Sequence, residues 1–319
     1  MMRRMCIVWV ASALACAAAA QAAPAVPAVP AAASGSRHGP AIHTEDVYRF
    51  YRVYDAYHGH PTAEQLQHRY LDPGSEGLHR LARLRNVTGS SMADNLTKHP
   101  AVYSNARRCM AVLPRVRRRL DKALRKLRQL YPPAVSAPIT IAVGRGKPVG
   151  VTDASGVMIG LEALCGISYF EPDVEDRFVH VLAHEYVHVQ QAVKSPAFYD
   201  KPKPTVLEES LIEGAAEFVG ELISGSVANV ELQARTRGHE KAIESTFVKD
   251  EAKTDLSDWL YNGTLTKPGD LGYWVGYRIV KSYYQHASDK RQALRDILQM
   301  RDARAFLARS GWYPGIRLH

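Results

Sequence analysis

Hydrophobic residues recur at helical spacing over two long stretches in the second half of the chain. The first begins after Pro172, a residue suited to the opening turn of a helix, and runs as EDRFVHVLAHEYVHVQQAV without a breaker. The second begins at Thr205, whose T-x-x-E spacing to Glu208 forms a capping box, and ends at Gly225. The pattern predicts two consecutive long helices.

Short apolar runs bounded by glycine precede these helices. ITIAVG begins at Ile139 and GVMIGLEAL at Gly156, and both have the β-branched composition of short strands. YWVGYRIVKSYY and RQALRDILQMRDARAFLA predict further helices near the end of the chain. Residues 44–105 look helical with glycine and proline interruptions. The predicted fold class is α+β, with a small sheet and a mostly helical C-terminal half.

The first 22 residues have the pattern of a secretory signal peptide. Arg3 and Arg4 precede an apolar run and an Ala-Gln-Ala step that ends at Ala22. A retained membrane anchor is the alternative, but the strongly apolar part is short. Lipid attachment at Cys16 is less favoured, because Ala13 stands where a lipoprotein signal usually has Leu. We therefore expect export to the periplasm or beyond.

Composition then divides the exported chain into a tether and a domain. Residues 23–43 are Ala, Pro, Val, Ser and Gly with almost no charge, which is typical of a linker. Residues 44–319 are long enough for one catalytic domain with a sizeable core, and we detect no internal repeat.

Basic residues are concentrated in one segment of a chain whose net charge is +9. Between Arg107 and Arg128 the only acid is Asp121, and apolar residues recur at helical spacing from Val116 to Leu130. This predicts an amphipathic helix with a cationic outer face. That face is either simply solvated or contacts anionic envelope polymers or lipid head groups. No recognition motif supports a nucleic-acid partner.

Two cysteines, Cys109 and Cys165, remain after removal of the signal peptide. They suffice for one disulfide in an oxidising compartment, but spacing alone leaves their pairing open. A zinc site built on cysteines is not expected, because the sequence has no C-x-x-C step.

The first long helix carries an H-E-x-x-H motif at His184, Glu185 and His188. Residues four apart share a helix face, so both imidazoles can bind one metal while Glu185 lies beside its open coordination position as a general base. The motif is surrounded by apolar residues, where unpaired polar side chains would be costly. A bound metal would remove that cost.

The second helix offers the third ligand. The extended motif with a third histidine is absent, because Gln191 and Lys194 occupy its Gly and His positions. Glutamates at four-residue spacing, Glu209 to Glu221, form either a solvated acidic face or a face turned toward a cation. Small residues after Glu213 favour close approach of the two helices. We predict Glu213 as a metal ligand, and Glu217 as the acceptor for the far ring N–H of a ligand histidine.

HEYVH followed by EGAAEF, with a later G-Y-x-x-G-Y element from Gly272 to Tyr277, resembles the gluzincin class and, within it, a bacterial family of predicted zinc-dependent proteases. The chain departs from typical gluzincins in having Glu217 where Asp is common. The resemblance implies a Zn²⁺ cofactor and a zincin-like fold, in which a small sheet packs on the histidine helix. It also implies an edge strand that pairs with extended substrate, for which residues 157–164 are the candidate.

Tyr273, Tyr277 and His239 are candidate donors to the oxyanion of the transition state, although each could be an ordinary packed or surface residue. His180, on the same helix face as His184, either approaches the metal or completes core hydrogen bonds.

The function expected from these features is peptide hydrolysis by a metal-activated water in the cell envelope. The alternatives are a zinc-dependent hydrolase of another envelope amide and a noncatalytic envelope-binding protein with a structural metal.

Overall fold

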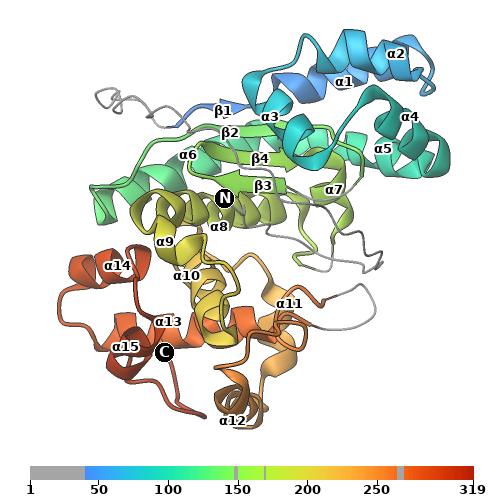
Figure 1. Ribbon diagram of the computed structural model, residues 1–319. Helices are drawn as coiled ribbons and strands as arrows, with labels where there is room; N and C mark the ends of the chain where they lie inside the picture. Colours follow the sequence, from blue (N-terminus) through green and yellow to red (C-terminus); the bar gives the residue numbers. More distant parts are fainter. Residues whose placement is uncertain (1–39, 147–149, 169, 264–268) are drawn as a thin grey trace, which may run out of the picture.

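The computed structural model describes residues 40–146, 150–168, 170–263 and 269–319. Its architecture is α+β, as predicted: a small sheet lies between a group of N-terminal helices and the long helix α8 (Val174–Lys194), and the later helices form the lower part of the molecule (Figure 1). The predicted signal peptide, Cys16 and nearly all of the predicted linker lie outside the described residues.

The sheet has four short strands in the order β1-β2-β4-β3. The two parallel pairings, β1 with β2 and β2 with β4, are followed by an antiparallel pairing of β4 with β3. The strands are β1 (Ile42–His43), β2 (Ile139–Ala142), β3 (Gly150–Asp153) and β4 (Gly156–Gly160). Ordered structure begins before Thr44, the predicted start of the domain. Residues 42–43, at the end of the predicted linker, form β1, and buried Ile42 pairs with Ile139.

The prediction that residues 157–164 form an edge strand is wrong. Strand β4 lies between β2 and β3, so both of its edges are already paired, and residues 161–164 belong to α7 (Leu161–Gly166). The sequence GVMIG is buried along its whole length, as expected of an interior strand. The edge strand next to β4 is β3. Its sequence, GVTD, has only one apolar side chain and therefore lacks the hydrophobic pattern of a strand.

Six helices and two irregular helical turns precede or flank β2. The predicted basic helix begins with a 3₁₀ segment, η2, and becomes α-helical only from Leu113, with its apolar residues buried. These elements are α1 (Glu45–Ala56), α2 (Ala63–Leu66), the π-helical η1 (Gln67–Leu71), α3 (Glu76–Arg85), α4 (Gly89–Lys98), α5 (Pro100–Ala106), η2 (Arg107–Val112) and α6 (Leu113–Leu130).

The two predicted long helices are confirmed as α8 and α10 (Val206–Ser224). Asp173 caps α8, and the Thr205 capping box begins α10. Helix α10 ends at Gly225, whose φ of +107° suits glycine. Helix α8 packs against β3, β4, α6 and α10, which explains why it is buried on almost every side.

The C-terminal half is helical, with one difference from the prediction. The stretch RQALRDILQMRDARAFLA forms two helices rather than one, because the Asp302 side chain accepts the Ala305 N–H and caps a new helix. The helices are α9 (Pro196–Tyr199), α11 (Val230–Thr236), α12 (Glu240–Asp250), α13 (Leu271–His286), α14 (Lys290–Leu298) and α15 (Ala303–Arg309).

Cys109 and Cys165 form a disulfide that joins η2 to α7, with 6.2 Å between their Cα atoms. The pairing that the sequence left open is thus present.

Among the described residues, no helix combines the length and apolar character needed to cross a membrane.

Helices α10 and α13 cross at backbone contact. A Cβ atom added to Gly214 would lie 2.0 Å from the carbonyl carbon of Gly276, and one added to Gly276 would lie 1.7 Å from the Ser210 carbonyl oxygen. No larger residue fits at either position without moving a helix. This close crossing brings the first turns of α13 next to the predicted ligand on α10.

We expect Gly214→Ala to destabilise the protein by about 3 kcal/mol, the upper end of typical overpacking costs, because the new methyl group meets backbone atoms that cannot rotate away. The free energy of unfolding from urea denaturation measures this cost. Gly166→Ala is the matched control, since nothing lies within 4 Å of the added atom, and it should change stability by less than about 0.5 kcal/mol. Equal stabilities would contradict the close crossing.

Candidate metal centre

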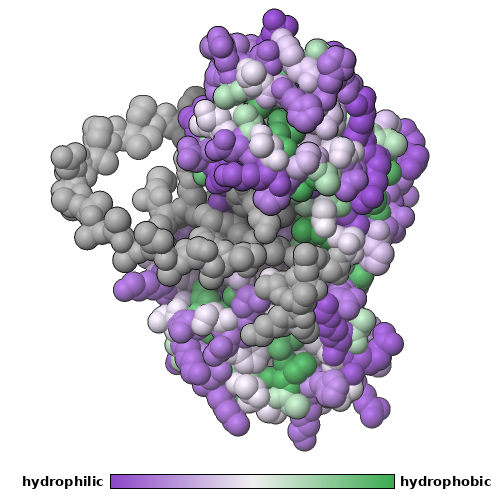
Figure 2. All heavy atoms as spheres, turned by 90° about the vertical axis from the view of Figure 1, so that its right-hand side faces the viewer, coloured by the Kyte–Doolittle hydropathy of each residue, from purple (hydrophilic) through white to green (hydrophobic). Residues whose placement is uncertain are grey.

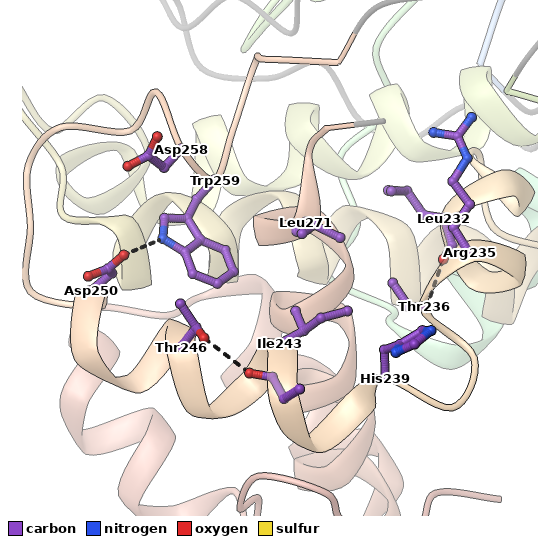
Figure 3. A pocket seen from close by; sticks show the side chains of 11 residues that line it. Leu232, Arg235, Thr236, His239, Ile243, Thr246, Asp250, Asp258, Trp259 and Leu271 are labelled. Atoms are coloured by element: carbon purple, nitrogen blue, oxygen red, sulfur yellow. Dashed lines mark hydrogen bonds between the residues drawn. The ribbon is translucent and has the colours of Figure 1, made fainter. Parts of the chain in front are cut away.

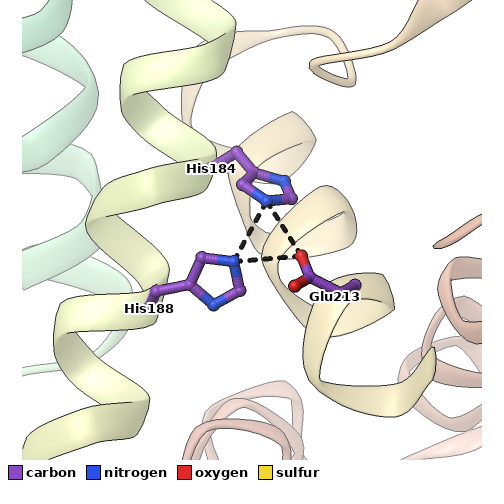
Figure 4. Close-up of side chains that lie close together, drawn as sticks. All are labelled: His184, His188 and Glu213. Atoms are coloured by element: carbon purple, nitrogen blue, oxygen red, sulfur yellow. Dashed lines mark hydrogen bonds and ion pairs between the residues drawn. The ribbon is translucent and has the colours of Figure 1, made fainter. Parts of the chain in front are cut away.

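Two imidazoles and one carboxylate converge between α8 and α10 (Figure 4). The Nε2 atoms of His184 and His188 are 3.1 Å apart. Glu213 Oε2 lies 3.3 Å from the first nitrogen and 3.1 Å from the second. All three residues are at most 5% exposed, so the structure brings together the three predicted ligands in a site shielded from water.

The donor set and its spacing fit zinc. A tetrahedral zinc site has ligand bonds of about 2.0–2.1 Å, which places the ligand atoms roughly 3.3–3.4 Å apart. The three observed separations are within about 0.3 Å of this value. Three protein ligands also leave a fourth position for water, as in catalytic rather than structural zinc sites.

Each histidine has a partner for its second ring nitrogen. His188 Nδ1 lies 2.7 Å from Gln191 Oε1, and the Gln191 amide donates in turn to the Ile212 carbonyl of α10. His184 Nδ1 lies 3.2 Å from Glu217 Oε1, an ion-pair distance without hydrogen-bond alignment. These contacts favour protons on Nδ1, which leave both Nε2 atoms free to bind a metal.

Charge is strongly coupled in the site. Burial opposes protonation of His184, but Glu213 and Glu217 outweigh it and raise the pKa of that imidazole. Burial likewise opposes ionisation of Glu213, yet the adjacent His188 and His184 hold its pKa well below the usual range. Both shifts have the same physical cause, the attraction between the Glu213 carboxylate and the adjacent imidazoles.

Glu185 is buried next to the edge of the sheet. The Thr152 hydroxyl of β3 donates a short hydrogen bond to Glu185 Oε2. A hydroxyl has only one proton to give, so this bond fixes one carboxylate oxygen and leaves the other able to accept a proton.

The two candidate tyrosines differ in their surroundings. The Tyr273 ring stacks on the His184 imidazole, with centroids 6.3 Å apart and an interplanar angle of 17°. The Tyr277 hydroxyl instead donates to Glu221 Oε2 at 2.8 Å, two turns beyond Glu213. Burial and Glu221 raise the pKa of Tyr277. Tyr273 is thus the nearer of the two to the ligands.

His180 and His239 contact other groups. His180 Nδ1 lies 2.8 Å from the Ser224 hydroxyl, the core hydrogen bond that was one of its two expected roles. His239 lies at the turn between α11 and α12 and lines a cavity of about 700 Å³ whose wall includes none of the three predicted ligands (Figure 3).

That cavity is bounded by apolar side chains, including Ile243, Trp259 and Leu271. The face of the molecule viewed in Figure 2 is mostly hydrophilic, with apolar atoms in several small groups, one of them near the bottom. The cavity is separate from the three ligands, although Leu271 lies only two residues from Tyr273.

Comparison with known families adds an independent observation. The family model described as Predicted Zn-dependent protease (DUF2268) matches residues 116–302, more than half of the chain. The chain belongs to this family. The matched region includes the whole of α8, α10 and α13, and the zinc in the family's description agrees with the donor set. No curated protein and no solved structure matches the chain.

Three residues around the site were not predicted as members of it. Gln191 could have been noticed, because it follows His188 by three residues and so shares its helix face. Thr152 and Tyr261 have no local sequence signal. Thr152 contacts Glu185 of α8 and Tyr261 contacts Glu213 of α10, each from a separate segment of the chain.

We expect Glu217→Ala to weaken zinc binding about 10- to 100-fold, because His184 loses the carboxylate that orients its ring. Competition with a chromogenic chelator measures the dissociation constant. Glu221→Ala, on the same helix with its carboxylate bound to Tyr277, is the control and should bind zinc like the parent. Equal affinity in the two variants would rule out a role for Glu217.

Proposed function

We propose that this chain is a zinc-dependent peptidase of the cell envelope, in which His184, His188 and Glu213 are the ligands. The observation that carries the proposal is the convergence of three buried donor atoms at separations of 3.1–3.3 Å, with no fourth protein donor in the group among the described residues. A structural zinc site would be closed by four protein ligands. Membership of a family described as zinc-dependent proteases supports peptide bonds as the substrate.

Bound zinc supplies a Lewis acid that polarises the scissile carbonyl and acidifies a water molecule. Glu185 is the proposed general base: it accepts the proton of the attacking water and delivers it to the leaving amine. The hydrogen bond from Thr152 fixes the orientation of the Glu185 carboxyl group for this role. Burial of Glu185 excludes bulk water from the proton-transfer path.

Tyr273 is the better supported of the two candidate oxyanion donors, because its ring lies over His184. Tyr277 would have to give up its hydrogen bond to Glu221 to take this role. The small sheet against α8 supports a zincin-like arrangement, with β3 rather than β4 as the strand whose edge could pair with an extended peptide.

We expect Glu185→Gln to retain stoichiometric zinc, because residue 185 is not one of the three proposed ligands. Peptide cleavage should fall by about 10²- to 10⁴-fold, because an amide cannot accept the proton of the attacking water. Elemental analysis and digestion of a fluorogenic peptide library provide the two measurements. Parental cleavage in Glu185→Gln would exclude it as the base. A folded parent that binds zinc but cleaves no peptide would favour another envelope amide as the substrate.

Export to the periplasm or beyond is part of the same proposal. The N-terminal pattern of residues 1–22 predicts it, and a disulfide between Cys109 and Cys165 supports it. Disulfides persist mainly in oxidising compartments.

The proposed envelope contact is a patch on α6. Arg115 and Arg119 are paired with acids at the start of α8, so they contribute little free charge. Four other basic residues are exposed and make no ion pair within the described ranges. We define the basic patch by them: Arg117, Arg118, Lys122 and Lys126. A set of unpaired cations on one helix face favours anionic lipid head groups.

Replacing Arg118 and Lys122 with Gln should reduce partitioning onto phosphatidylglycerol vesicles about 30-fold, since each cation near an anionic surface contributes about 1 kcal/mol. A sedimentation assay at low salt measures the partition coefficient. Lys241→Gln with Lys249→Gln removes the same charge from α12 and serves as the control. Equal losses in both double variants would indicate a general charge effect and no docking patch.

A further inference from the structure

Tyr261 contacts the candidate metal centre from a segment that carries no motif. Its hydroxyl lies 3.0 Å from Glu213 Oε1, the carboxylate oxygen that is turned away from the two histidines. The same hydroxyl forms a shorter hydrogen-bonded contact with Glu209 Oε1, one helical turn before Glu213. Both glutamates are nearly fully buried. One phenol therefore bridges two carboxyl groups behind the site.

The backbone of Tyr261 is held in an unfavourable conformation. Its φ is +60°, which bulky residues rarely adopt. The neighbouring residue fixes this geometry, because Asn262 N–H donates to Asp270 Oδ1 at 3.0 Å and Asp270 N–H donates back to Asn262 Oδ1 at 2.7 Å. Strain of this kind persists only where the surroundings determine the conformation. Here it directs the phenol toward α10.

Tyr261 also packs against Tyr273. Their rings meet edge to face with centroids 6.1 Å apart, and Tyr273 in turn stacks on His184. The segment around residue 261 thus contacts the site at two points, through the Glu213 carboxylate and through the ring above His184.

The phenol oxygen is held between the two carboxyl groups. A phenol has one proton, so at any moment it donates to one carboxyl group and offers a lone pair to the other. Its oxygen nevertheless lies within hydrogen-bonding distance of both Glu209 Oε1 and Glu213 Oε1. Glu209 therefore helps to fix the position from which the phenol contacts Glu213.

We propose that Tyr261, supported by Glu209, is a positioning residue that fixes Glu213 Oε1 so that Oε2 faces the two histidines before the metal arrives. This inference rests on the proposed zinc site. A carboxylate held in this way binds through one oxygen, which keeps the fourth coordination position open. Without the bridge, Glu213 loses the contact that holds Oε1 away from the histidines, and binding through both oxygens becomes more favourable.

The test measures metal binding in Tyr261→Phe, with Tyr277→Phe as the matched control, since that hydroxyl binds Glu221 of the same helix. Chelator competition should give zinc binding about 10- to 100-fold weaker in Tyr261→Phe and parental in Tyr277→Phe. In the cobalt-substituted proteins, the visible absorption bands should change in Tyr261→Phe alone, because they report ligand geometry. Parental affinity and bands in Tyr261→Phe would overturn the proposal.

Two substitutions at Glu209 test its support of the phenol. Glu209→Gln keeps a polar group within reach of the phenol oxygen, so it should retain zinc affinity within about threefold, whereas Glu209→Leu should resemble Tyr261→Phe. Parental affinity in Glu209→Leu would contradict a supporting role for Glu209. A folded parent that binds neither zinc nor cobalt would defeat the proposed function itself, an outcome distinct from a parent that binds zinc with no effect of Tyr261→Phe.

Discussion

The backbone contact between α10 and its neighbours is the constraint on which the site depends. Gly214 contacts Gly276 of α13. Gly220 lies so close to α8 that an added Cβ would be 3.3 Å from the backbone nitrogen of His184. A glutamate side chain is short, so Glu213 reaches both imidazoles only because α10 approaches α8 this closely. The glycines thus set the separation of the ligands, although none of them contacts a metal.

Close packing also creates the chemical problem that the site solves. Four helical residues, His184, His188, Glu213 and Glu217, place ionisable groups where water cannot hydrate them. Each has a partner from a different element, and within the group the pKa of His184 is raised by the carboxylates while that of Glu213 is lowered by the imidazoles. Such mutual dependence is typical of functional sites, where removal of one member leaves another charge buried and unpaired.

The sequence predicted those parts of the site that have local signals. The helix of His184 and the capped helix of Glu213 follow from periodicity, a capping box and terminal glycine, and the four-residue spacing places both histidines on one face. The contact between these two helices could be predicted only from the small residues that follow Glu213. Thr152 and Tyr261 could not be predicted, because the first lies in a four-residue strand and the second in a left-handed backbone conformation, 48 residues from its partner. The order of the strands was likewise set by tertiary pairing, and for that reason an interior strand was mistaken for an edge.

The disulfide between Cys109 and Cys165 encloses most of the structure that packs against α8 on the side of the sheet. Cys109 and Cys165 are 56 residues apart, and the loop between them contains α6 together with β2, β3 and β4. Closing a loop of this size lowers the entropy of the unfolded chain by an amount equivalent to about 4 kcal/mol. The sheet from which Thr152 reaches Glu185 therefore belongs to the covalently restrained part of the molecule. Reduction of this disulfide would therefore release the covalent restraint on the strand that carries Thr152, whereas His184, His188 and Glu213 lie outside the enclosed loop.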